Sequence, residues 1–181
     1  MDICYYGNPI LREKGRLVTQ FDKALQDYVR ALTAEMYEKD GIGLASQQVG
    51  QAVQIAVIDV SRVDTTPEVL LDGKVLHFSL LMPLVIINPV IRTIGREKTV
   101  RDEGCLSFPE IFEPVERVYE IEVKYQDEHG QSHALRCNAM LARCIQHETD
   151  HLNGILFIDR MNKNVFKQVE PQLEFIKQNY I

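Results

Sequence analysis

The segment His147-Glu148-Thr149-Asp150-His151 has the residue types of a catalytic metal site. If this segment is helical, its two histidines lie on one face and can bind one ion, with the glutamate beside that ion. Such a site needs a third protein ligand, a position for water and a carboxylate that takes the proton of that water. Because so short a pattern also arises by chance, its interpretation depends on the other segments of the chain.

Candidates for the third ligand lie on both sides of this motif. One protease pattern places a third histidine six residues after His151, where this sequence has Phe157. The other protease arrangement uses a downstream glutamate, and only Glu170 and Glu174 remain for that role. Glu170 is a weak candidate because it precedes Pro171, where we expect a helix to kink or begin.

An upstream candidate is Cys105, within the segment EGCLS of residues 103–107. A thiolate is a strong ligand for a divalent metal and balances part of its charge. The preceding glycine permits a close backbone approach, and the Leu106 N–H could be directed at a substrate. A third segment, GIGLASQQ of residues 41–48, combines two glycines with the side-chain amide of Gln48, although an ordinary helix-to-strand turn would also explain it.

Length and composition favour a globular protein. The 181 residues, 45% hydrophobic and 25% charged, can bury a core, and we expect one domain over residues 1–181 because no repeat or linker divides them. The net charge of −6 gives no footprint for nucleic acid or an anionic membrane. The amino terminus lacks the pattern of a secretion signal, and the longest apolar stretch is too short to span a bilayer. We therefore expect a cytoplasmic protein with no nucleic-acid or membrane partner.

Two helices are expected next to these motifs. Apolar residues at helical spacing predict an amphipathic helix over about 22–39, directly before the glycine-rich segment. Asn138 can cap a second helix that begins at Ala139, and Gly154 suits the left-handed position past its end. One stripe of this second helix contains Met140, Cys144, His147 and His151. We expect the two histidines of this stripe to face inward.

Strand patterns occur in residues 53–58, 84–94 and 119–125. The second of these is interrupted or ended at Asn88-Pro89. The third alternates apolar and charged residues and turns through 127–130 into 132–136, which predicts a hairpin. The polar segment 62–77 is expected to be an exposed excursion. Because helices and strands do not alternate as repeated βαβ units, the sequence favours an antiparallel α+β fold.

The three motifs together resemble the peptide deformylase family. The family pattern is G-φ-G-φ-A-A-x-Q, then E-G-C-L-S, then Q-H-E-x-x-H overlapping D-H-L-x-G; this chain has GIGLASQQ, EGCLS and QHETDHLNG. Residues 7–12 are similar to the amino-terminal segment of the family. Ser46 replaces the usual second alanine, and the sequence gives its hydroxyl no partner. The resemblance implies antiparallel β-sheets packed around a central helix that carries the HExxH motif.

The resemblance also implies a reaction: removal of the formyl group from the N-terminal formyl-methionine of newly made polypeptides, with release of formate. The implied metal ligands are Cys105, His147 and His151. Glu148 would act as general base and return a proton to the leaving amine. The Gln48 side-chain amide and the Leu106 backbone N–H would stabilise the oxyanion together with the metal.

Substrate-binding residues follow from the same resemblance. Ile42, Gly43 and Leu44 would run beside the substrate backbone as an added strand. Met140, Cys144 and Leu106 would line the methionine pocket, although packing in the core explains Met140 and Cys144 nearly as well.

The implied cofactor is one divalent metal ion. The family typically uses Fe²⁺, with Ni²⁺, Co²⁺ or Zn²⁺ as substitutes, and one cysteine with two histidines is compatible with all four. The implied partners are N-formyl-methionyl peptides or nascent chains, and association with the ribosome is suggested by resemblance alone. Asp150 could support His151 by facing a cation such as Arg117, with a surface position for both as the alternative.

Two other functions stay open on the sequence. A zinc endopeptidase would share the histidine pair, would need Glu170 or Glu174 as its third ligand, and would cut internal peptide bonds. A non-catalytic metal-binding protein could keep the same scaffold for peptide binding. The presence of Glu148 and Gln48 argues against the second, since such a protein needs neither a base nor an oxyanion donor.

Overall fold

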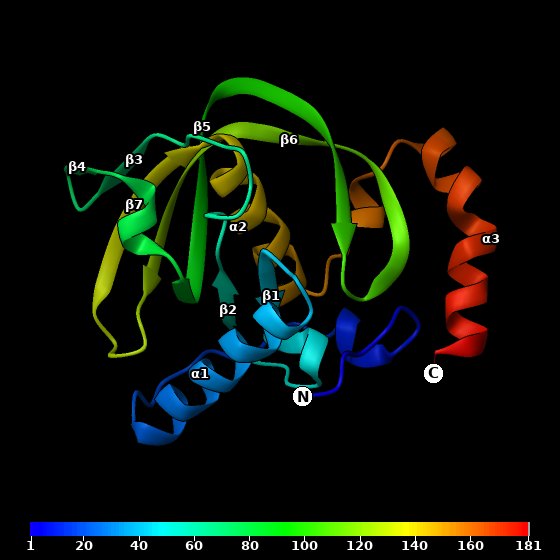
Figure 1. The fold of residues 1–181 in the computed structure, drawn as a ribbon, viewed down its shortest axis with the longest axis horizontal. Helices are drawn as coiled ribbons and strands as arrows, with labels where there is room; N and C mark the ends of the chain where they lie inside the picture. Colours follow the sequence, from blue (N-terminus) through cyan, green and yellow to red (C-terminus); the bar gives the residue numbers. More distant parts are fainter. Residues whose placement is uncertain (181) are drawn as a thin grey trace.

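Seven strands between residues 43 and 138 form one antiparallel sheet, in the order β1-β2-β5-β6-β7-β3-β4 (Figure 1). The computed structural model describes residues 1–180. The strands are β1 (Gly43–Ala45), β2 (Ile55–Ile58), β3 (Val69–Leu71), β4 (Lys74–Leu76), β5 (Leu84–Cys105), β6 (Phe108–Gln126) and β7 (Ser132–Asn138). The helices are α1 (Lys23–Glu38), α2 (Ala139–Leu152) and α3 (Lys163–Asn179), with short 3-10 helices η1 (Pro9–Arg12), η2 (Ser46–Val49), η3 (Phe78–Leu81) and η4 (Phe157–Arg160). The predicted α+β class is confirmed, with one sheet where several were expected.

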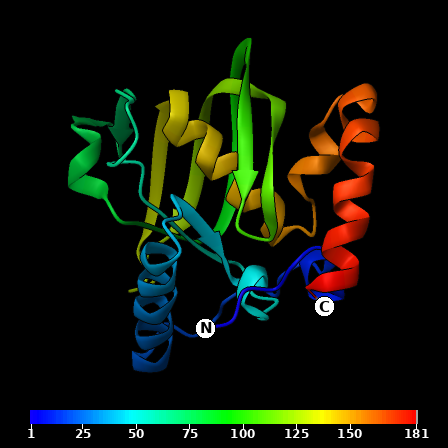
Figure 2. The ribbon, with the colours of Figure 1, turned by 45° about the vertical axis from the view of Figure 1, so that its right-hand side comes forward.

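Helix α2 is the central element, and most of its residues are buried. It packs against β1, β2, β6 and β7, and the views in Figures 1 and 2 show the long strands arching over it. Its bounds match the prediction, and Gly154 has the expected left-handed φ of 72°. Asn138 occupies the N-cap position, but its side chain makes no capping bond. Its Oδ1 instead accepts from the Glu68 N–H at 2.8 Å, which ties the excursion to the start of α2.

Helix α1 confirms the helix predicted over 22–39. Asp22 caps it by accepting from the Leu25 N–H at 3.0 Å. Its apolar stripe, including Leu32 and Met36, is buried against β1 and β2. This packing places the end of α1 beside the entrance to β1.

The β5–β6 hairpin is much longer than the predicted strands 84–94 and 119–125. A bulge lies between Ile87 and Val90, where Asn88 has a φ of 53°, so Asn88-Pro89 interrupts the ladder without ending the strand. Most residues from 95 to 102 are exposed and polar, so they carry no apolar alternation that would mark a strand. The extension brings Cys105 to the end of β5.

The excursion predicted over 62–77 is mostly exposed, and it contains a short hairpin that the sequence did not indicate. Asp72 and Gly73 have positive φ values of 49° and 79°, which is the backbone of a two-residue hairpin turn. The turn joins β3 to β4, and β3 pairs with β7. The sequence did not indicate this hairpin because the segment is polar and because β3 and β4 are each only three residues long.

Helix α3 lies on the side of the molecule opposite β3 and β4 (Figures 1 and 2). It begins at Lys163 and continues through Pro171, so no helix starts at the proline. Its buried residues Val169, Leu173 and Ile176 pack in a second apolar cluster. Within residues 1–180, no helix is both long and apolar enough to cross a membrane.

Candidate metal centre

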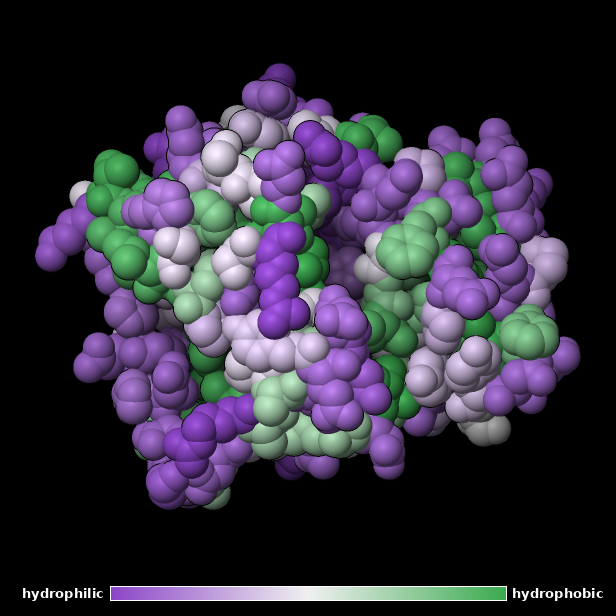
Figure 3. Space-filling model, in the orientation of Figure 1, coloured by the Kyte–Doolittle hydropathy of each residue, from purple (hydrophilic) through white to green (hydrophobic). Residues whose placement is uncertain are grey.

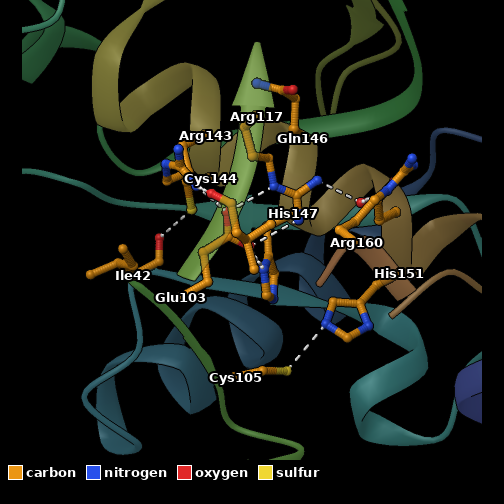
Figure 4. A network of polar contacts seen from close by, with 12 residues as sticks. Ile42, Glu103, Cys105, Arg117, Arg143, Cys144, Gln146, His147, His151 and Arg160 are labelled. Carbon is orange, nitrogen blue, oxygen red and sulfur yellow. Dashed lines mark hydrogen bonds and ion pairs between the residues drawn. The ribbon is translucent and has the colours of Figure 1, made fainter. Parts of the chain in front are cut away.

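Three side chains that can bind metal converge between β5 and α2 (Figure 4). Cys105 is the last residue of β5, and His147 and His151 lie one turn apart on α2. Their ligand atoms all lie within 4.8 Å of one another, and Cys105 Sγ is 3.3 Å from His151 Nε2. One thiolate and two imidazoles form a donor set that suits a divalent transition metal. These three residues could therefore hold one ion.

The two histidines are prepared for this role in different ways. His151 is 1% exposed, and burial holds the pKa of His151 well below its usual value, which favours the neutral form that binds metal. His147 is oriented by a carboxylate, since its Nδ1 lies 2.9 Å from Glu103 Oε2. That contact leaves the Nε2 of His147 for the metal centre.

Glu103 is the hub of a buried ionic network (Figure 4). Its carboxylate accepts two hydrogen bonds from Arg117, at 2.8 and 2.9 Å, and one from Arg143 at 2.7 Å. Burial disfavours the charged carboxylate, but the bonds from His147 and Arg117 outweigh it and hold the pKa of Glu103 well below its usual range. Glu103 is thus a fixed anion behind His147.

The same network reaches Asp150, next to His151. Arg117 donates to Asp150 at 2.6 Å, so the expected pairing of Asp150 with a cation is confirmed. Arg160 of η4 donates to the other carboxylate oxygen at 2.7 Å. These contacts hold η4 and β6 against the helix that carries the histidines.

Sequence reasoning missed Arg143 and Arg160 as members of this network. Arg143 also donates to the Thr99 and Val115 carbonyls, at 2.7 and 2.9 Å. Arg143 precedes His147 by four residues, about one helical turn, so it lies beside the stripe predicted to face inward. A buried cation there requires a partner, which is a signal that could have found it. Arg160 carries no comparable signal, because its partner contact depends on how η4 folds back.

Glu148 points into the same space without a partner of its own. Its side chain is buried, and its Oε2 has no hydrogen-bond partner within residues 1–180. Burial raises the pKa of Glu148 to about 7. A Cβ at Gly43 would lie 2.2 Å from Glu148 Oε1. A side chain at position 43 would therefore displace the Glu148 carboxylate, and glycine permits the close approach of β1.

Gln48 has a fixed orientation beside Cys105. Its Oε1 accepts from the Ala45 N–H at 2.9 Å, while its Nε2 lies 3.4 Å from both Cys105 Sγ and Ser107 Oγ. The amide thus directs its N–H groups towards the metal centre. Ser46 Oγ donates to the Ile55 carbonyl at 3.0 Å, so the expectation of a hydroxyl without a partner was wrong.

A cavity of about 570 Å³ opens beside Cys105, His147 and Glu148. Figure 3 shows a hollow near the middle of the face that it draws. Its lining includes Ile42, Gly43, Gln48, Leu106, Met140, Cys144 and Glu148. Leu44 does not line the cavity, because its side chain is fully buried and packs in the core under α1. Met140 and Cys144 contact both the cavity and the central core cluster, so the two expected roles are compatible.

The glutamates that a protease would need lie elsewhere. Glu170 and Glu174 are exposed on α3, and Glu174 pairs with Lys177 at 2.7 Å. Neither belongs to the group of side chains that could hold a metal.

Comparisons with known proteins agree with this site. The family model described as polypeptide deformylase matches residues 1–167. A peptide deformylase of Opitutus terrae is 49% identical over 176 residues, covering 95% of this chain and 90% of the relative. The crystal structure of a G41M mutant of Arabidopsis thaliana peptide deformylase 1B has a TM-score of 0.85 at 34% identity, covering 99% of this chain and 91% of that one. A Plasmodium falciparum peptide deformylase has a TM-score of 0.84 at 35% identity, covering 99% and 96%. By its motifs, its fold and these relatives, the chain belongs to the polypeptide deformylase family.

Proposed function

We propose that this chain hydrolyses the formyl group from the N-terminal formyl-methionine of newly made polypeptides and releases formate, with the site residues assigned below. One observation carries the assignment: a cysteine and two histidines converge beside a buried carboxylate oxygen that has no partner within residues 1–180. A site of this kind has both a place for a metal ion and a group that can move a proton. The zinc endopeptidase alternative is not favoured, since Glu170 and Glu174 lie outside the group that could hold a metal.

Cys105, His147 and His151 would hold one divalent ion, and we assign Fe²⁺ to it, with Ni²⁺, Co²⁺ or Zn²⁺ able to substitute. The ion would supply Lewis acidity, which polarises the formyl oxygen and makes water easier to deprotonate. The thiolate and the neutral imidazoles match this class of ion without selecting one member of it.

Glu148 moves the proton in both halves of the reaction. With a pKa raised to about 7, its carboxylate accepts a proton from the attacking water as the new C–O bond forms at the formyl carbon. Glu148 then gives that proton to the amide nitrogen as the C–N bond breaks, which yields formate and a free amine. The Gln48 Nε2 and the Leu106 N–H donate to the oxygen that becomes negative between these steps.

The edge strand β1 aligns the substrate backbone. It pairs with β2 on one side only, and Asp59 N donates to Ile42 O across that pair at 2.9 Å. In an antiparallel ladder the bonding direction alternates along the strand, so the N–H and C=O of the next residue, Gly43, point away from β2. An extended peptide can pair with them there, and its methionine side chain would enter the cavity beside Met140 and Cys144.

We further propose that residues 1–181 act as one domain and that the enzyme works in the cytoplasm on nascent chains. The short distances between β5, α2 and η4 in the ionic network support one cooperative unit. Association with the ribosome rests on the family resemblance alone.

The test is formate release from formyl-Met-Ala-Ser by anaerobically purified protein whose metal content is measured in the same preparation. We expect turnover that scales with bound Fe²⁺ and no cleavage of an internal peptide bond. Protein that contains metal and releases no formate would refute the proposal, and cleavage of an unformylated peptide would favour the endopeptidase.

A further inference from the structure

The substrate-pairing strand β1 is short and needs support from outside the ladder. It has three residues, and the segment that leads into it, residues 39–42, lines the cavity and lies mostly at the surface. Pairing with β2 alone fixes few backbone groups in such a strand. Contacts around residues 37–42 therefore decide how β1 is presented to a substrate.

Asp59 joins three pieces of chain at this point. It follows β2 and is 7% exposed. Its carboxylate accepts from the Tyr37 hydroxyl at 2.5 Å and from the Ser61 N–H at 2.8 Å. Its own N–H donates to the Ile42 carbonyl at 2.9 Å. One residue thus connects the last turn of α1, the turn after β2 and the entrance to β1.

The pKa values of Tyr37 and Asp59 are shifted in opposite directions. Burial and the bond to Asp59 raise the pKa of Tyr37 to about 12. Burial disfavours the charged form of Asp59, but the bonds from Ser61 and Tyr37 outweigh it and lower the pKa of this carboxyl. At neutral pH the tyrosine is therefore always the donor and the aspartate always the acceptor.

Two further residues, Arg62 and Cys144, contact the same segment. The Arg62 guanidinium lies 4.8 Å from the centroid of the Tyr37 ring and 3.9 Å from Asp40, whose backbone has a positive φ of 54°. On the cavity side, Cys144 Sγ donates to Ile42 O at 3.4 Å. The Ile42 carbonyl is therefore held from both β2 and α2.

We propose that Asp59, with Tyr37, is a positioning residue that holds β1 so that the Gly43 backbone faces the cleft and pairs with the substrate. The inference rests on the proposed function. Asp59 touches neither the substrate nor the metal ligands; it acts through Ile42. If the bond between Asp59 and Ile42 is disturbed, Gly43 loses the alignment that lets its N–H and C=O bind a peptide backbone.

The test compares two substrates, formyl-Met-Ala-Ser and N-formylmethionine amide, which has no residue after the methionine. Asp59→Ala should raise KM for the tripeptide roughly threefold to tenfold, the loss expected from about one hydrogen bond. Its kcat, its metal content and its kcat/KM for the amide should stay as in the unmodified enzyme. Asp59→Asn, which can still accept from Ser61, should recover part of the loss, and Tyr37→Phe should shift KM in the same direction.

Asp127→Ala is the matched control. Asp127 caps the β6–β7 turn by accepting from the His129 and Gln131 N–H groups, at 2.9 and 2.8 Å, and it does not line the cavity. We expect this variant to lower Tm without changing either KM.

Equal losses on both substrates in Asp59→Ala, or a KM change in Asp127→Ala as large as that in Asp59→Ala, would overturn the inference. If Asp59→Ala does not fold, Tyr37→Phe decides the question by the same comparison. Absence of formate release by the unmodified enzyme would instead refute the proposed function.

Discussion

Glu103 and Glu148 lie near the same two histidines, yet their environments are opposite. Glu103 accepts from Arg117 and Arg143 and contacts His147, so its negative charge is stabilised. Glu148 is buried, one of its oxygens has no partner within residues 1–180, and burial is the main cause that raises its pKa. A carboxylate that is fully paired holds its charge, and one that is buried and unpaired exchanges a proton readily near neutral pH. The environment of Glu103 therefore suits it to orient His147, and the environment of Glu148 suits it to transfer a proton.

Glu148→Gln tests this separation. The amide has nearly the same shape as the carboxylate but cannot accept a proton, so kcat should fall by about 10² to 10⁴-fold, the usual contribution of general acid–base catalysis. Metal content should not change, because Glu148 does not ligate in the proposed site. Formate release by the variant at a near-normal rate would contradict the assignment.

Gln48→Ala and Ser46→Ala form a second comparison, because each removes a buried hydrogen bond from the same loop. Only Gln48 directs a donor at the metal centre, so its loss should lower kcat by about 10² to 10³-fold. Ser46→Ala should cost about 1 kcal/mol of stability and leave kcat unchanged. Steady-state kinetics and thermal melts of both variants give the answer. A Ser46→Ala enzyme slower than Gln48→Ala would place the oxyanion donor elsewhere in the loop.

The sequence predicted the elements whose pattern is local. Helices α1 and α2 were placed to within a residue or two, because each segment has an apolar stripe and is followed closely by a glycine, Gly41 after α1 and Gly154 after α2. The far half of β5 could not be predicted, since its residues are exposed and polar and pair only because β6 lies beside them. The β3–β4 hairpin was missed for a related reason, as its strands are completed by β7.

Some contacts of the candidate site were likewise predictable from local motifs, and others were not. The convergence of Cys105 with His147 and His151 was expected from three motifs, and the structure brings these residues together. The contact between Glu103 and His147 was not foreseen, although Glu103 begins the cysteine motif. Contacts of this kind depend on how two elements pack, which residue spacing within one element does not determine.

The β3–β4 hairpin should make stability depend on pH through one ion pair. Asp72 in its turn lies 2.7 Å from His133 of β7. The hydrogen bond to Asp72 raises the pKa of His133, and bonds from Ala134 and His133 lower the pKa of Asp72. The histidine contribution is complete below its unfolded value, about 6.5, and is lost as the pH rises through the raised value. The aspartate contribution is present above about pH 4 and is lost on further acidification.

His133→Asn should therefore lower Tm more at about pH 5.5 than at about pH 8.5. His129→Asn is the control, because His129 is exposed in the neighbouring turn. The effect should be small, since both partners are partly exposed and water screens the pair. A Tm difference that grows towards high pH would contradict the predicted direction of the His133 shift.

Ionic contacts behind the metal centre tie together elements that are distant in the sequence. Glu103 of β5, Arg117 of β6, Asp150 of α2 and Arg160 of η4 form one continuous network. The proposed ligands add a second link between β5 and α2, because Cys105 belongs to one element and the histidines to the other. A metal ion bound there would stabilise the folded chain as a whole.

Metal removal should therefore lower the stability of the entire protein. A ligand that binds only the folded state stabilises it by about 2.7 kcal/mol when its free concentration is about 100 times Kd. For a protein of this size, that corresponds to a fall in Tm of roughly 5 to 10 °C on chelation. Cys105→Ser should start from a lower Tm in the presence of metal and respond less to the chelator, because a hydroxyl is a poor substitute for a thiolate. Calorimetry with and without chelator measures both shifts. If chelation lowers Tm equally in Cys105→Ser and in the unmodified protein, the ion that stabilises the fold is not held by Cys105.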